Sequence, residues 1–362
     1  MQWRAILSGA VGLVVCAVLV GAPTGPATGK GKAPPKVEAV FTDVDKAPAD
    51  FKFQGEYEGT AGDKKIGVQV IALGDQKFQC VFHQGGLPGA GWDKSEKVCI
   101  DAKMEGDMVL LAPSKAKKKY MAVPPDEFSA TDKPPAEQKA YSGTIQGGEL
   151  KGKSDAGVEF ACKRVVRESP TLGAKPPEGA IVLFDGTKTD EFNGGRLDAD
   201  KKVLCTDGKD ITTKRKFNNY TAHVEFMLPY KPTGRGQGRG NSGFYQVDCY
   251  EVQVLDSFGL MGKNNECGGI YTKADPKVNM CLPPLQWQTY DVDFRNAEYA
   301  DGKKVKSAVA TLKHNGVVIH ENFEISGPTG GGRKEDGTPG PIKLQGHGNP
   351  LQYRNVWVVE QK

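Results

Sequence analysis

The chain has 362 residues, a length that suits two domains better than one small module. Its 46 glycines and 23 prolines exceed the roughly 12% of residues that these two types supply on average, which argues against a helical bundle and favours short strands joined by turns. With 48 basic and 44 acidic side chains, the net charge of +4 carries no signature of a nucleic-acid-binding protein.

Residues 1–22 have the pattern of a secretory signal peptide. Arg4 precedes the uncharged run Ala5–Val20, which is shorter than the roughly 20 residues that a membrane-spanning helix needs, and small residues and Pro23 follow it. We therefore expect a secreted or periplasmic protein, with an uncleaved N-terminal anchor as the alternative. Residues 23–50 are rich in Pro, Gly, Lys and Thr, a composition typical of a flexible tether.

Residues 51–167 predict a small accessory β domain. Strand-like segments at 66–73 and 77–82 flank Gly74-Asp75, which is the pattern of a hairpin. This region contains no paired acids and no cluster of metal ligands, so we assign no chemistry to it. Three further segments are candidate strands: 109–111, 141–145 and 158–166.

Residues 168–178 have the Pro and Gly content of an interdomain linker, and a stronger strand pattern follows over 179–362. Tyr220–Leu228 alternates apolar and polar residues, as a half-buried strand does, and Asn315-Gly316 is a strong hairpin signal. The other expected strands are Tyr245–Leu255, Tyr290–Phe294, Ala308–Lys313, Val317–His320, Ile342–Leu344 and Tyr353–Val359. So many strands without a helical stretch predict a two-sheet sandwich of the jelly-roll type.

The segment Tyr250–Asp256 is the most informative of these strands. Glu251 and Gln253 share one face, while apolar residues occupy the other. That polar face either meets bulk water or lines a concave ligand-binding surface. Asp256 departs from the alternation, so only a bulge or the end of the strand would bring it beside Glu251.

Two glycine-rich segments accompany this strand. Gly238–Gly243 matches the dinucleotide-binding pattern GxGxxG, but a strand follows it where that site needs a helix, so we expect a loop that brings Arg239 and Asn241 to the rim of the sheet. His347 lies in the second segment, where an extended strand places Gln345 on the same face. This histidine is either a hydrogen-bonded turn residue or an accessible group that titrates near neutral pH.

Four motifs occur in order along residues 179–360: Leu183-Phe-Asp-Gly186, Gly240-Asn-Ser-Gly243, Tyr250–Asp256 and Gly340–Asn355. With these motifs in this order, this part of the chain resembles the 3-keto-disaccharide hydrolase domain family. The resemblance implies a concanavalin A-like jelly roll, in which two curved antiparallel sheets form a ligand groove on the concave face. The residues before it look like the β extension found ahead of this domain in planctomycete-type exported proteins.

Two segments depart from the family pattern. The loop Arg235–Arg239 is longer and more basic, and Gly259–Pro284 carries Cys267 and Cys281. Both departures bear on the choice of substrate.

The resemblance implies an exported enzyme that cleaves 3-keto-glycosides or related glycans. Glu251, Gln253 and Asp256 match the family's polar strand and are similar to the Glu-x-Asp-x-x-Glu layout of laminarinase-like enzymes, although Gln253 replaces the middle acid of that layout. A retaining hydrolase would need two paired carboxylates. A ketone at C3 offers another route, because it acidifies the C2 proton and makes the glycosidic oxygen a leaving group. The enzyme is then either a hydrolase, which cleaves the bond directly or by elimination across C1–C2, or a lyase.

On this interpretation one of Glu251 and His347 is the base and the other the acid, with either assignment open, and Asp256 supports them. The alternative is a non-catalytic carbohydrate-binding protein on the same sandwich, for which aromatic side chains would supply stacking platforms. No metal-ligand spacing occurs, and the sequence names no cofactor. The residues expected to bind sugar hydroxyls or the enolate are Arg239, Asn241, Gln253, Gln345 and Arg354.

Of the eight cysteines, Cys16 would leave with the signal peptide. In an exported protein we expect a disulfide between Cys267 and Cys281, which would close the longest loop. The odd number of remaining cysteines leaves at least one free thiol.

Overall fold

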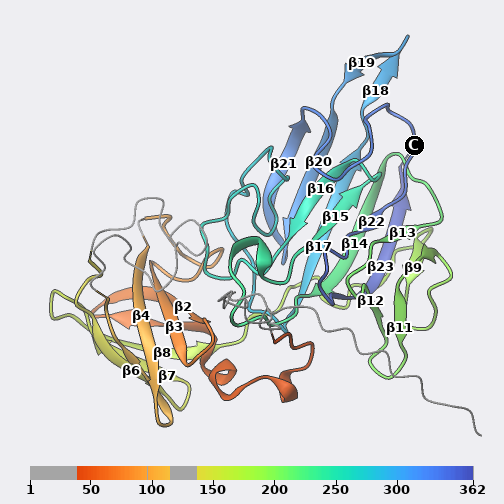
Figure 1. Cartoon of the computed structure of the whole chain (residues 1–362). Helices are drawn as coiled ribbons and strands as arrows, with labels where there is room; N and C mark the ends of the chain where they lie inside the picture. The colour runs from red at the N-terminus through yellow and green to blue at the C-terminus, as the bar shows by residue number, and fades with distance from the viewer. Residues whose placement is uncertain (1–38, 96, 115–136, 362) are drawn as a thin grey trace, which may run out of the picture. The chain divides into compact units, whose positions relative to one another are not determined.

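The computed structural model describes residues 39–95, 97–114 and 137–361, which contain a barrel and a sandwich (Figure 1). The expected signal peptide at 1–22 lies outside the described residues. Among the residues described, no helix has the length and apolar character needed to cross a membrane. The helical elements described there are three short 3-10 turns, η1 (Val44–Lys46), η2 (Ala49–Phe53) and η3 (Gly236–Gly238).

The accessory domain is a closed barrel of eight antiparallel strands, in which each strand pairs with the next in sequence and the last returns to the first. The predicted hairpin is confirmed, because Asp75 and Gln76 adopt positive φ angles of 51° and 60° between β2 and β3. The sequence analysis missed β1, β4 and β7. The strands are β1 (Gly55–Ala61), β2 (Lys64–Ala72), β3 (Lys77–Gln84), β4 (Val98–Glu105), β5 (Met108–Leu111), β6 (Ser142–Gln146), β7 (Glu149–Lys153) and β8 (Glu159–Val165).

The second domain is a sandwich of two antiparallel sheets, which confirms the predicted fold class. The five-stranded sheet has the order β10 (Phe192–Asn193), β13 (Ile211–Thr213), β22 (Lys343–Leu344), β15 (Ser242–Gln246) and β16 (Tyr250–Val254). The eight-stranded sheet contains β11 (Arg196–Asp198), β12 (Val203–Cys205), β23 (Gln352–Glu360), β14 (Tyr220–Met227), β17 (Trp287–Arg295), β20 (Ala308–His314) and β21 (Val317–Ile325), with β9 (Ile181–Phe184) paired to β23.

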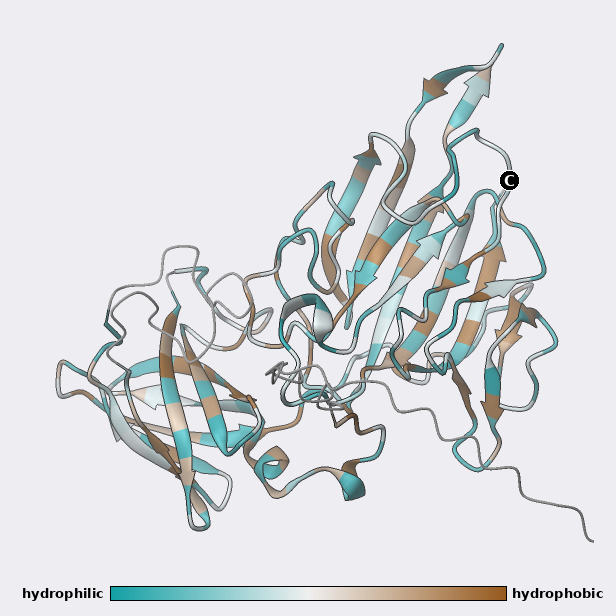
Figure 2. Ribbon diagram, viewed as in Figure 1, coloured by the Kyte–Doolittle hydropathy of each residue, from teal (hydrophilic) through white to brown (hydrophobic). Residues whose placement is uncertain are grey.

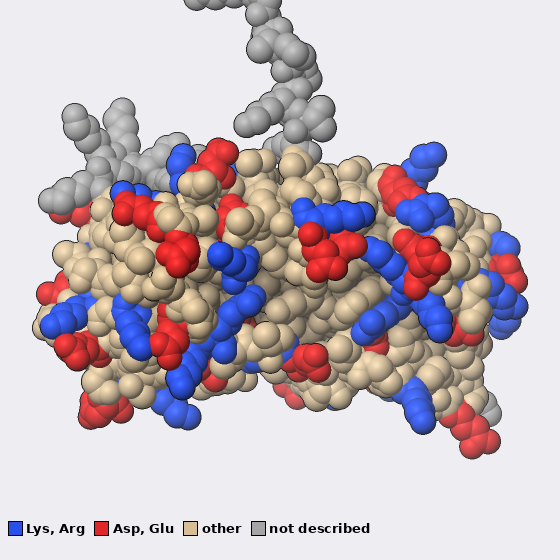
Figure 3. Space-filling model, turned by 90° about the horizontal axis from the view of Figure 1, so that it is seen from below, with Lys and Arg blue, Asp and Glu red and all other residues tan. Residues whose placement is uncertain are grey.

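The core of the sandwich lies between these sheets. Phe226 and Tyr290 of the eight-stranded sheet pack with ring centroids 4.8 Å apart, and Phe244 of the five-stranded sheet reaches the same cluster. Figure 2 shows the matching alternation of hydrophobic and hydrophilic bands along these strands. A separate hairpin, β18 (Glu298–Ala300) and β19 (Lys303–Lys306), extends from the sandwich. Basic and acidic side chains are interspersed over the face in Figure 3, as the small net charge leads one to expect.

The structure corrects the single strand predicted over Tyr245–Leu255. This segment folds back on itself as the hairpin of β15 and β16, because Val247 and Asp248 take positive φ angles of 46° and 55°. Such angles are uncommon for valine, and no glycine marks the turn, so no sequence pattern predicts a turn at these two residues. The hairpin places Glu251 directly opposite Tyr245.

The structure also differs from the expected linker and tether. Residues 168–178 lie against the outer face of the eight-stranded sheet: Thr171 Oγ1 donates a hydrogen bond to Asp291 Oδ2 at 2.7 Å, and the Gly173 N–H donates to Glu225 Oε1 at 2.6 Å. Residues 39–50 belong to the folded part, since Phe41 and Tyr230 exchange two main-chain hydrogen bonds of 2.9 and 2.8 Å. The rest of the expected tether, residues 23–38, lies outside the described residues.

The expected disulfide is absent, because the seven described cysteines are all free, buried thiols. Cys267 Sγ lies 3.1 Å from the Tyr290 hydroxyl, and Cys281 Sγ contacts the Leu282 carbonyl at 3.4 Å. The two thiols also interact with each other through a side-chain hydrogen bond, so they lie side by side in the core as free thiols.

Candidate active site

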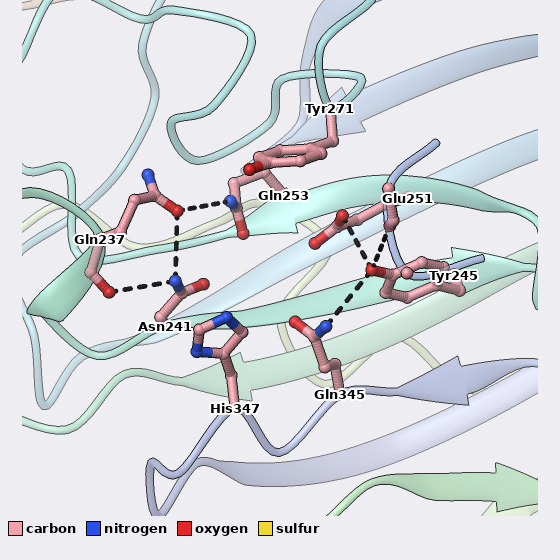
Figure 4. A pocket seen from close by; sticks show the side chains of 10 residues that line it. Gln237, Asn241, Tyr245, Glu251, Gln253, Tyr271, Gln345 and His347 are labelled. Atoms are coloured by element: carbon pink, nitrogen blue, oxygen red, sulfur yellow. Dashed lines mark hydrogen bonds between the residues drawn. The ribbon is translucent and has the colours of Figure 1, made fainter. Parts of the chain in front are cut away.

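A cavity of about 310 Å³ opens over the β15–β16 hairpin, on the face of the five-stranded sheet that points away from the core (Figure 4). Phe244 and Val252 alternate with the pocket residues of these strands and are buried in the core. The lining residues are Gln237, Asn241, Tyr245, Glu251, Gln253, Tyr271, Gly330, Gly331, Gln345 and His347.

Gly243 makes room for the carboxylate of Glu251. The residue lies on β15 next to the Tyr245–Glu251 pair, and a Cβ at this position would come within 2.3 Å of Glu251 Oε1. The distance is far below van der Waals contact, so any side chain here would displace the acid. The Gly-Asn-Ser-Gly motif thus ends in a glycine that the site itself requires.

Glu251 is buried, with 4% of its surface exposed, and this burial raises the pKa of its carboxyl to about 7. A hydrogen bond from Tyr245 and the charge of Lys343 act in the opposite direction but do not offset the burial. At neutral pH both forms of the carboxyl are therefore populated.

The Tyr245 hydroxyl can serve both of these forms. It lies 2.9 Å from Glu251 Oε2 and 2.8 Å from the Gly330 carbonyl, yet it has one proton to donate. Tyr245 can donate to ionised Glu251. When it donates to Gly330 instead, the contact with Glu251 requires a proton on the carboxyl. Gain or loss of that proton needs no rearrangement of the pocket beyond a rotation of the hydroxyl.

His347 occupies a tightly held turn on the rim, across the cavity from Tyr271 (Figure 4). Its backbone has a positive φ of 44°, and the preceding Gly346 lies so close to Lys209 that a Cβ would meet main-chain atoms at 2.3 Å. The Gly346 N–H also donates to Asp210 Oδ1 at 2.9 Å. These contacts hold the turn while the side chain of His347 stays exposed to the cavity.

Five of the predicted site residues line this cavity: Glu251, His347, Asn241, Gln253 and Gln345. The sequence analysis did not single out Gln237, Gly330 or Gly331. Gln237 lies in the basic loop that departs from the family pattern, which was a usable signal. The two glycines lie in a loop far along the chain, where no sequence pattern connects them to Glu251.

Three predicted residues lie elsewhere. Asp256 follows the end of β16 and turns inward to bind Arg239, with Arg239 Nε and Nη2 at 3.0 and 2.8 Å from Asp256 Oδ2 and at most 1% of either side chain exposed. A buried pair of this kind is occupied by its own interaction and does not line the cavity. Arg354 lies on β23, where it donates to Glu225 at 2.6 Å in the eight-stranded sheet, because its register pairs it with that residue.

The site combines one acid with one imidazole, two tyrosine hydroxyls and four side-chain amides. Glu251 is the single carboxylate among the described lining residues. The cavity therefore lacks, among those residues, the pair of carboxylates about 5–5.5 Å apart that defines a retaining glycosidase. What the geometry offers is proton transfer at one buried carboxyl beside donors and acceptors suited to a polyhydroxylated ligand.

The chain is similar to proteins of known structure and to one protein family. The sequence is 33% identical to a protein of Parabacteroides distasonis proposed to be a glycosyl hydrolase, whose crystal structure aligns over 51% of this chain and 85% of that chain with a TM-score of 0.48. A second proposed glycosyl hydrolase of that organism is 18% identical over 55% of this chain and 99% of that chain, with a TM-score of 0.38. No curated protein matches the sequence. The model of the 3-keto-alpha-glucoside-1,2-lyase-like domain matches residues 179–359, half of the chain, and the protein therefore belongs to that family.

Proposed function

We propose that this protein cleaves 3-keto-glycosides by general acid–base catalysis through elimination across C1–C2, with Glu251 as the base. The observation that carries the proposal is the one carboxylate among the described residues that line the cavity, whose pKa of about 7 lets it take up and return a proton at neutral pH. The family to which residues 179–359 belong supports the same substrate class.

In the proposed reaction, ionised Glu251 removes the proton at C2, which the ketone at C3 acidifies. The electron pair of that C–H bond forms the C1=C2 double bond, and the bond between C1 and the glycosidic oxygen breaks. The departing oxygen takes a proton from His347, which releases the alcohol and leaves an unsaturated 3-keto sugar.

Addition of water to this product completes a hydrolysis. Water attacks C1 and gives a proton to His347, and Glu251 returns its proton to C2. Both side chains are then in their starting forms. The two halves use the same two groups in opposite directions, as microscopic reversibility requires.

The test is turnover of a nitrophenyl 3-keto-glucoside by the purified protein, with the unoxidised glucoside as control. We expect release of nitrophenol from the 3-keto compound alone, and incorporation of deuterium at C2 of the sugar product in D₂O. Saturable binding without turnover would contradict the proposal and favour the carbohydrate-binding alternative.

Export is a further part of the proposal and depends on the sequence of residues 1–22. Mass spectrometry of the mature protein should find an N-terminus within Gly21–Ala27. Recovery of the intact N-terminus from the cytoplasm would contradict export and would leave the chemistry of the site untouched.

A further inference from the structure

Three side-chain amides on one side of the cavity, those of Gln237, Asn241 and Gln253, form a hydrogen-bonded chain (Figure 4). Gln237 Oε1 accepts from Asn241 Nδ2 at 3.1 Å and from Gln253 Nε2 at 3.2 Å. An amide has a donor end and an acceptor end, so the direction of such a chain decides what each end presents to a ligand.

Main-chain groups determine this direction, because their polarity is unambiguous. The N–H of Val254 lies 3.0 Å from the side-chain oxygen of Gln253, so the nitrogen of that amide must point the other way, toward Gln237. The carbonyl of Asn265 lies 2.7 Å from the nitrogen of Gln237 and can only accept, which leaves the oxygen of Gln237 to face the other two amides.

Asn241 is oriented by the same logic. Its side-chain nitrogen lies 3.0 Å from the main-chain carbonyl of Gln237 and 3.1 Å from the side-chain oxygen of that residue, two groups that can only accept. The nitrogen of Asn241 must therefore occupy this position, and its oxygen is left to face the cavity.

That oxygen has no donor among the residues that the structure describes, although the side chain is only 2% exposed. A buried acceptor without a partner is costly, and a ligand that donates a hydrogen bond to it recovers that cost. The site therefore favours a ligand that donates a hydrogen bond to Asn241 Oδ1.

We propose that Asn241 is a specificity-determining residue that accepts a hydrogen bond from a hydroxyl of the sugar; this inference rests on the proposed function. A ketone has no proton to donate, so the C3 carbonyl of the substrate does not occupy this position. An enolate is excluded for the same reason, because its negative oxygen would face an acceptor. One of the hydroxyls at C2, C4 or C6 makes the contact.

The test is a cycle between enzyme variants and substrate analogues. Wild type, Asn241→Ala and the control Gln84→Ala, at an exposed amide on β3 of the barrel, are assayed on a nitrophenyl 3-keto-glucoside and on analogues in which the C2, C4 or C6 hydroxyl is replaced in turn by fluorine. Fluorine keeps the size of the group but removes its proton. Comparison of enzymes on the same analogue cancels any change in the intrinsic reactivity of the sugar.

For one analogue we expect kcat/KM of the wild type to fall about ten- to a hundredfold. Asn241→Ala should react slowly with the parent sugar but show almost no further loss on that analogue, whereas Gln84→Ala should keep the wild-type discrimination. If Asn241→Ala does not fold, Asn241→Ser enters the same cycle, because it also withdraws the carbonyl oxygen.

Turnover of the parent sugar with equal losses in wild type and in the Asn241 variant on every analogue would overturn this inference and leave the proposed function intact. No turnover of any 3-keto-glucoside by the wild type would overturn both.

Discussion

Glu251 is the residue on which the proposed chemistry depends. Replacement by glutamine keeps the shape of the side chain but removes its capacity to take up a proton. We expect Glu251→Gln to lower kcat by about 10²–10⁴-fold, the range typical of a general acid or base. Steady-state kinetics on a 3-keto-glucoside measures this, and a loss smaller than tenfold in a folded variant would assign the base role to another group.

The same carboxyl makes stability depend on pH. Its pKa of about 7 lies above the ordinary value of 4.5, so the folded state holds a proton that the unfolded chain has already released. The contribution of this carboxyl to the free energy of unfolding is fully present below pH 4.5 and is lost as the pH rises through 7. The whole loss amounts to about 3 kcal/mol.

Glu251→Gln removes this dependence. We therefore expect the variant to gain stability over the wild type as the pH is raised from 5 to 8, measured as the free energy of unfolding in urea. A difference that is constant across this range would show that the carboxyl is ionised throughout.

At the level of strands, the β15–β16 hairpin holds the acid above Gly243. We expect Gly243→Ala to displace the carboxylate of Glu251 and to lower kcat/KM by about tenfold or more, because the added Cβ would come within 2.3 Å of Glu251 Oε1. Gly238→Ala, two residues before the Gly-Asn-Ser-Gly motif, is the matched control, since a Cβ there meets nothing within 4 Å. Equal activity of the two variants would contradict this account of the motif.

The segment 168–178 is a second element whose contacts can be tested. Burial opposes the ionisation of Glu225, but hydrogen bonds from His223, Asn355, Arg354 and the Gly173 N–H outweigh it and lower the pKa of this carboxyl to about 2. These hydrogen bonds favour the ionised carboxylate of Glu225.

Glu225→Gln removes this negative charge and weakens the hydrogen bonds that it accepts. We expect this variant to melt at a lower temperature than the wild type and to be cut faster within 168–178 by a protease of broad specificity. Glu324→Gln, at an exposed position of the same sheet, should behave as the wild type does.

The positions of the strands could be predicted well from the alternation of apolar and polar residues, and the positions of the turns less well. The alternation of Tyr220–Leu228 places β14 within one residue of its observed end, and Asn315-Gly316 marks a real hairpin, with φ angles of 49° and 78°. The turn at Val247 and Asp248 could not be predicted, because neither residue type favours a positive φ as glycine does.

The site could be predicted only in part for a related reason. A period of two places Glu251 and Gln253 on one face and leaves Asp256 off it, as the structure has them. No local pattern records that Arg239 folds back on Asp256, or that the register of β23 carries Arg354 to the other sheet. These placements depend on contacts between residues distant in the chain.

For the molecule as a whole, the seven described cysteines provide a test of its packing. All are buried free thiols, so a thiol reagent should label almost none of them in the native protein and all seven in denaturant. Mass mapping that finds Cys267 linked to Cys281 would instead restore the disulfide expected from the sequence.

The position of β23 has a consequence for the order in which the molecule folds. The barrel joins neighbours in sequence, so most of its pairing can form while the chain is still being made. The sandwich cannot do so, because β23 lies between β12 and β14 near the middle of the eight-stranded sheet. Until residues 352–360 have been synthesised, β12 can pair only with β11 and β14 only with β17, so the sheet stays in two pieces. The eight-stranded sheet is therefore completed last, and a chain bound for export would keep its catalytic half incompletely folded until synthesis is almost complete.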